Sequence, residues 1–143
     1  MNNNPLQRVS ELIRGVIELL WNRPEGLSAR EVIAHLPEIV NLTGHEIGLS
    51  PKSHTPRYER TIRIATLPLV KAGWLLKTEK GQWLLTEDGR HACRRFPSSQ
   101  DLFLEAVRLS EALRQHTPDI LVSLDLIQEK AWETIANFIR GKT

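Results

Sequence analysis

The chain has 143 residues, of which 41% are hydrophobic and 25% charged, a size and composition typical of one globular domain. A single cysteine, Cys93, excludes an internal disulfide and a cysteine-rich zinc site. The N-terminal residues lack the pattern of a signal peptide, and no apolar run approaches the ~20 residues that span a bilayer. We therefore expect a cytoplasmic protein with no membrane-spanning segment.

The net charge of +2 is unevenly divided along the chain. Residues 1–50 hold four Arg against six Glu, and residues 96–143 hold five basic against seven acidic residues. Residues 51–95 hold ten basic against four acidic residues. A net-basic segment of this kind is typical of a surface that binds the phosphate backbone of nucleic acid. A solvated basic face without a ligand has the same composition.

The N-terminal third predicts two helices and a short strand. Apolar residues at three- and four-residue spacing predict a helix over residues 5–23. Leu27 is expected to form a very short strand against a later hairpin. Ser28 and Glu31 have the spacing of a capping box, which opens a second helix that Pro37 ends or bends.

A long connection, residues 41–55, leads to the basic region. Thr43 and Glu46 form a second capping-box pattern, which predicts a short helix over residues 44–48. The residues after it lie just ahead of a helix N-terminus, where free N–H groups and the helix dipole favour an anion. They are candidate DNA contacts: Lys52, Ser53 and His54.

A basic helix is predicted over residues 55–72. Thr55 is expected to cap it, with Pro56 in its first turn and Gly73 at its end. Pro68 predicts a kink, because it removes one N–H donor and crowds the preceding turn.

The two faces of this helix differ. The predicted core stripe is Tyr58, Ile62, Ala65, Leu69 and Ala72. The candidate DNA contacts are Arg57, Arg60, Thr61 and Arg63. Arginine can read guanine or clamp a phosphate, and the sequence does not separate these roles. Ile64 and Leu67 fall on the exposed side, where we expect other elements to cover them; contact with a partner or a thymine methyl is the alternative.

A hairpin is predicted directly after the basic helix, with strands over residues 74–78 and 82–85. Gly81 supplies the positive φ that its three-residue loop needs. A helix followed by such a hairpin is the second half of a winged helix-turn-helix, in which the helix enters a DNA groove and the wing lies beside it. Lys77 and Lys80 are the candidate phosphate contacts of the wing.

Two tryptophans flank the hairpin loop. Trp74 and Trp83 are expected to pair across the two strands. We expect them to fill the core beneath the wing; the alternative is stacking on bases.

Thr86 has the position of an N-cap for a further helix over residues 87–96. Its basic residues extend the candidate DNA surface: Arg94 and Arg95. His91 and Cys93 are two residues apart and therefore do not share a face as a metal pair would.

Residues 97–99 mark the expected domain boundary. We divide the chain into a winged-helix DNA-binding domain, residues 1–96, and a helical extension, residues 97–143, with two amphipathic helices. The fold class expected is mainly α with a small β-hairpin. Three roles for the extension stay open: it packs on the first domain, it forms a homodimer contact through residues 101–139, or it links the first domain to a further one.

Four motifs occur in a fixed order along the chain: Arg23-Pro24-Glu25-Gly26, Ser28-Ala29-Arg30-Glu31-Val32, Lys71-Ala72-Gly73 and Lys80-Gly81-x-Trp83-x-Leu85-Thr86-x-x-Gly89. This ordered set resembles the N-terminal winged-helix domain of Mrr-like, type IV restriction endonucleases. The resemblance implies a DNA-binding specificity module for duplex DNA, modified bases included, and in that family a metal-dependent nuclease domain follows.

The nuclease chemistry of that family is not expected in this chain. No lysine has an acidic residue two positions before it, and Gln128-x-Lys130 keeps only part of the family motif. His45-Glu46 lacks the second histidine of a zinc protease pattern. We expect no catalytic residue, metal or cofactor here. Two other interpretations stay open: a protein-interaction or dimerisation module, and a stand-alone transcription regulator.

Overall fold

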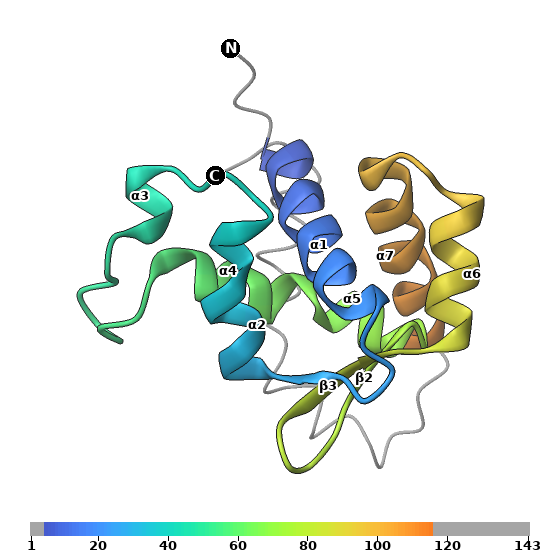
Figure 1. Cartoon of the computed structure of the whole chain (residues 1–143). Coiled ribbons are helices and arrows are strands. Elements are labelled where there is room, and N and C mark those ends of the chain that lie inside the picture. Colours follow the sequence, from blue (N-terminus) through green and yellow to red (C-terminus); the bar gives the residue numbers. More distant parts are fainter. Residues whose placement is uncertain (1–4, 116–143) are drawn as a thin grey trace.

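The computed structural model describes residues 5–115. It is mainly helical with a small three-stranded antiparallel sheet (Figure 1), as expected for the fold class. The second helix of the extension, the pair Gln128-x-Lys130 and most of the expected dimer contact lie outside the described residues. The elements are α1 (Pro5–Trp21), β1 (Leu27–Ser28), α2 (Ala29–His35), η1 (Leu36–Glu38), α3 (Gly44–Ile47), α4 (Arg57–Ala65), α5 (Leu67–Lys71), β2 (Leu75–Lys77), β3 (Gln82–Leu85), α6 (Glu87–Arg95) and α7 (Ser99–Gln115).

The sheet has the order β1-β3-β2, with both pairs antiparallel. Leu27 pairs with Trp83, which confirms the short strand expected before α2. Gly81 closes the hairpin with φ +85°. The expected pairing of Trp74 with Trp83 is wrong, because the register places Lys77 opposite Trp83 and leaves Trp74 before β2.

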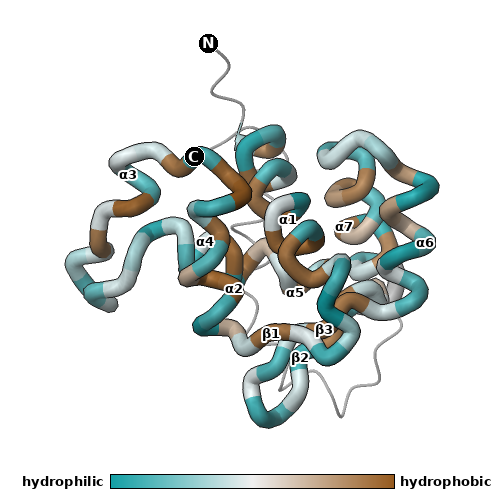
Figure 2. Tube along the Cα trace, in the orientation of Figure 1, coloured by the Kyte–Doolittle hydropathy of each residue, from teal (hydrophilic) through white to brown (hydrophobic). Residues whose placement is uncertain are grey.

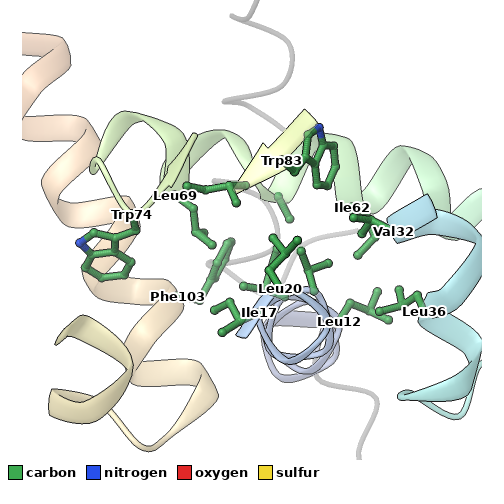
Figure 3. Packing of buried hydrophobic residues seen from close by; sticks show 14 of the residues in the cluster. Leu12, Ile17, Leu20, Val32, Leu36, Ile62, Leu69, Trp74, Trp83 and Phe103 are labelled. Carbon is green, nitrogen blue, oxygen red and sulfur yellow. The ribbon is translucent and has the colours of Figure 1, made fainter. Parts of the chain in front are cut away.

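Helix α1 is the centre of the hydrophobic core. Its residues Leu12, Val16 and Leu20 are fully buried, and the helix packs against α4, β3 and α7. Figure 3 shows this cluster, with Trp74 and Trp83 entering it from well-separated positions. Both tryptophans are buried, so they fill the core as expected.

Helix α7 belongs to the same core. Leu102, Phe103 and Ala106 are fully buried, and α7 packs on α1 and α5. The side chain of Arg14 fixes the α6–α7 connection by donating to the carbonyls of Phe96 at 3.1 Å and Pro97 at 2.7 Å. The first part of the extension therefore packs on the helices of the preceding residues, and its apolar face is used inside the chain.

The basic helix predicted over residues 55–72 is broken into α4 and α5 at Thr66. Pro68 lies in the first turn of α5, where its missing N–H is tolerated. The expected cap at Thr55 is wrong: Pro56 is the N-cap residue, and it has no side chain able to cap. The hydroxyl of Thr55 instead bonds that of Ser53 at 2.8 Å.

Several local predictions are confirmed. Ser28 and Glu31 make the capping box of α2, and Thr43 and Glu46 make that of α3. Thr86 caps α6 by accepting from the Gly89 amide. Ile64 and Leu67 are each partly buried, which agrees with the expected cover.

Candidate nucleic-acid interface

The outward face of α4 carries two exposed arginines. Arg60 has no hydrogen bond or ion pair within residues 5–115, so its guanidinium is available to a ligand. The Nε of Arg63 lies 3.1 Å from the Oε2 of Glu59 in a partly exposed pair. Thr61 is half-buried beside them. The predicted DNA-facing side of α4 is therefore open to solvent.

Arg57, at the start of α4, is half-buried and holds the preceding segment. Its backbone N–H donates to the carbonyl of Gly48 at 3.0 Å, and its Nη1 donates to the carbonyl of His45 at 3.2 Å. Arg57 therefore supports the residues that precede α4, a role outside the two alternatives left open by the sequence, guanine reading and phosphate binding.

The loop over residues 50–55 lies directly before α4. Backbone bonds close it from Ser50 N to Thr55 O at 2.8 Å and from His54 N to Ser50 O at 2.9 Å. His54 adopts the left-handed conformation, with φ +58°. Lys52 and His54 are exposed on this loop, as is Ser53, so the fold brings these three candidates to the N-terminal end of α4.

The two wing lysines have different environments. Lys80 is exposed at the hairpin tip, which is tied to the start of α2 by a 2.9 Å bond from the Ala29 amide to the Gly81 carbonyl. Lys77 points inward, and its Nζ donates to the Thr66 hydroxyl at 2.8 Å and lies 4.3 Å from the centre of the Trp83 ring.

Burial, and to a smaller extent the nearby charge of Arg63, lowers the pKa of Lys77 to about 8. Through its bond to Thr66, the ammonium of Lys77 links β2 to the end of α4. The structure therefore brings Lys80, and not Lys77, to the outer surface of the hairpin.

Arg94 and Arg95 are not brought to the α4 face. Helix α6 lies on the other side of α1 from α4 (Figure 1). The guanidinium of Arg94 lies 5.8 Å from the centre of the Trp21 ring, and that of Arg95 lies 5.4 Å from the Phe96 ring. Arg90, at 5.0 Å from the Trp21 ring, lies with Arg94 at that ring, so the basic residues of α6 form a group separate from the α4 face.

Two features of this surface are not predicted by the sequence patterns. Arg30 is exposed at the start of α2, next to the hairpin tip. Ile47 and Leu49 are exposed beside the start of α4, although both are aliphatic. The exposure of this pair could have been predicted from the length of α3, because a four-residue helix followed by a polar loop is too short to bury an apolar face.

Metal ligation finds no support in the part of the chain that the structure describes, where no group of three metal-ligating side chains comes together. Nor does any helix among these residues have the length and apolar character needed to cross a membrane. Comparisons with family models, curated proteins and solved structures gave no match, so the assignment of this surface rests on its own geometry.

Proposed function

We propose that this chain is a duplex DNA-binding module that uses α4 as its recognition helix and the β2–β3 hairpin as its wing. The observation that carries the proposal is the open face of α4, where Arg60 has no hydrogen bond or ion pair within residues 5–115 and Arg63 is exposed beside it. Lys52 and Lys80 flank this face from the preceding loop and the hairpin tip. The helix and the wing both belong to the net-basic segment of the chain.

The charged groups divide into two roles. Lys52 and Lys80, on loop tips, suit phosphate contacts that supply affinity and position the duplex. Arg60 projects from the recognition helix and can donate two bonds to the O6 and N7 of a guanine. Arg57 stabilises the start of α4 by donating to the carbonyl of His45 in the preceding segment.

The resemblance to the Mrr-like winged helix supports a place in a restriction endonuclease-like protein, with this module supplying specificity and a separate domain supplying cleavage. A stand-alone transcription regulator would use the same surface. Reading the gene beyond Thr143 for a nuclease motif separates these two biological contexts.

A titration of labelled duplex DNA tests the proposal. We expect binding at ~50 mM salt that weakens steeply as salt is raised, because each phosphate contact releases counterions. The double variant Arg60→Gln/Arg63→Gln should bind at least tenfold more weakly, since a good arginine contact contributes about 1–3 kcal/mol.

A charge-matched control is available on the same chain. Arg94→Gln/Arg95→Gln removes the same two charges from α6 and should keep nearly the parent affinity. Absence of binding at ~50 mM salt, or equal loss in both double variants, would contradict the proposed interface.

A further inference from the structure

Helix α3 is fixed in place without contributing to the core. None of its residues is buried. Its position is set by polar bonds: Arg8 of α1 donates to both carboxylate oxygens of Glu46, at 2.6 and 2.8 Å, and to the carbonyl of Asn41 at 2.9 Å. The Arg8 guanidinium holds the pKa of Glu46 below its usual range. Such bidentate pairs fix geometry as well as charge.

The residues after α3 are fixed as well. Leu49 forms an isolated antiparallel bridge with Pro56, and Arg57 bonds the carbonyls of His45 and Gly48. The loop between them is closed by its own backbone bonds. The α3 segment, residues 43–56, is therefore a preorganised part of the fold joined to the start of α4.

This segment presents two aliphatic side chains to solvent. Ile47 is 54% exposed and Leu49 is 58% exposed. Figure 2 shows hydrophobic positions at the end of α3 and just after it, at the edge of the molecule. The α3 segment is fixed by polar bonds, has no fully buried residue and exposes two aliphatic side chains. Such an arrangement suits contact with a partner.

The surrounding charges indicate which partner. Arg57 bonds the carbonyls of His45 and Gly48, on either side of Ile47. Lys52 is exposed on the loop after Leu49, and Arg60 is exposed on α4. The acid of the α3 segment, Glu46, is neutralised by Arg8. An aliphatic pair inside a positive rim is complementary to DNA, whose major groove carries thymine methyl groups beside phosphates.

We propose that Ile47 and Leu49 form a second DNA contact that reads thymine methyl groups, on the side of α4 away from the hairpin tip. This inference rests on the proposed function and deepens it. In Figure 1 the α3 segment and the hairpin lie at different sides of α4, so the duplex meets three elements: the aliphatic pair, the recognition helix and the wing.

The test combines a change in the protein with a change in the DNA. A duplex selected for tight binding to the parent chain is compared with the same duplex in which uracil replaces thymine, which removes the methyl groups alone. The parent should lose about three- to fourfold in affinity for each methyl contacted. The variant Ile47→Ser/Leu49→Ser should bind the thymine duplex about tenfold more weakly and be insensitive to the uracil exchange.

Two controls accompany the double variant. Ile39→Ser changes another exposed isoleucine, which lines a surface pocket with Arg14 and Glu18 of α1, and it should keep the parent affinity and the uracil sensitivity. The dependence of affinity on salt should be the same for Ile47→Ser/Leu49→Ser as for the parent, because no charge is removed.

The outcomes separate the two proposals. If the parent binds DNA but neither the uracil exchange nor the double variant changes its affinity, the second contact is wrong and the proposed function stands. If the double variant changes the particle mass in light scattering while DNA affinity is unchanged, the pair belongs to a protein interface and the inference is overturned. If the parent binds no duplex at ~50 mM salt, both proposals fail.

Discussion

The ammonium group of Lys77 donates to the hydroxyl of Thr66 at 2.8 Å, which joins strand β2 to the break between α4 and α5. The same hydroxyl donates to the carbonyls of Ile62 and Arg63, at 2.8 and 3.1 Å. Thr66 is fully buried. The Thr66 side chain thus bonds two carbonyls at the end of α4 and accepts a bond from a lysine of the β2–β3 hairpin.

This contact predicts a distinctive pH dependence of stability. The pKa of Lys77 is about 8 in the folded chain, below its ordinary value of 10.5, so between these values the unfolded chain binds more protons. The free energy of unfolding should therefore rise with pH across this window, by roughly 1–3 kcal/mol from this group. Urea unfolding of the parent and of Lys77→Met at pH 7 to 10.5 measures it. The rise should be absent in Lys77→Met; an identical pH profile in both would contradict the assignment.

The two wing lysines should differ in DNA binding. Lys80→Gln removes an exposed charge at the hairpin tip and should reduce the slope of log affinity against log salt by about 1. Lys77→Gln alters an inward group and should leave that slope unchanged. Titrations at four salt concentrations provide both slopes, and equal slopes for the two variants would argue against the different placements.

Glu46→Gln should loosen α3 from α1. The variant loses the charged partner of Arg8, and we expect a destabilisation of about 1–2 kcal/mol at pH 7. The folded pKa of Glu46 is lowered, so the parent's advantage should be present above pH 4.5 and disappear as pH falls through the folded value. Thermal unfolding as a function of pH checks this. Glu11→Gln, which changes the exposed carboxylate 3.3 Å from Arg8, should remain within about 0.5 kcal/mol of the parent.

Gly89→Ala should be strongly destabilising. A Cβ at this position would lie 2.3 Å from the backbone oxygen of Trp74, an atom that cannot move aside without shifting the start of the wing. Overpacking of this kind costs typically 1–3 kcal/mol. Gly44→Ala, in α3, meets nothing within 4 Å and is the matched control. Chemical unfolding of both variants tests the contact, and similar stabilities would mean that α6 does not pack closely on β2.

The features predicted correctly from the sequence are those that depend on neighbouring residues. The capping boxes of α2 and α3 and the positive φ of Gly81 depend on residues within a few positions of one another, and all three are confirmed. The cap at Thr55 failed because Pro56 occupies the N-cap position.

Contacts between residues far apart in the sequence could not be predicted from local patterns. Arg8 and Glu46 are 38 residues apart, and nothing in their local sequence marks them as partners. Lys77 stands two residues after the buried Leu75, so it shares the inner face of β2. Its partners there, the Thr66 hydroxyl and the Trp83 ring, come from other parts of the chain and are not marked in its local sequence. The placement of Arg94 and Arg95 likewise depends on how α6 packs against α1.

The break at Thr66 also sets the length of α4, the proposed recognition helix. With nine residues, α4 is about 14 Å long, close to the ~12 Å width of a DNA major groove. An unbroken helix through Lys71 would extend well past that width. Instead the chain turns at Thr66 into α5, whose Pro68 carbonyl accepts a 2.8 Å bond from the Ser110 hydroxyl of α7. The bend thus ends the proposed reading element after nine residues and leaves the following turn to anchor the fold.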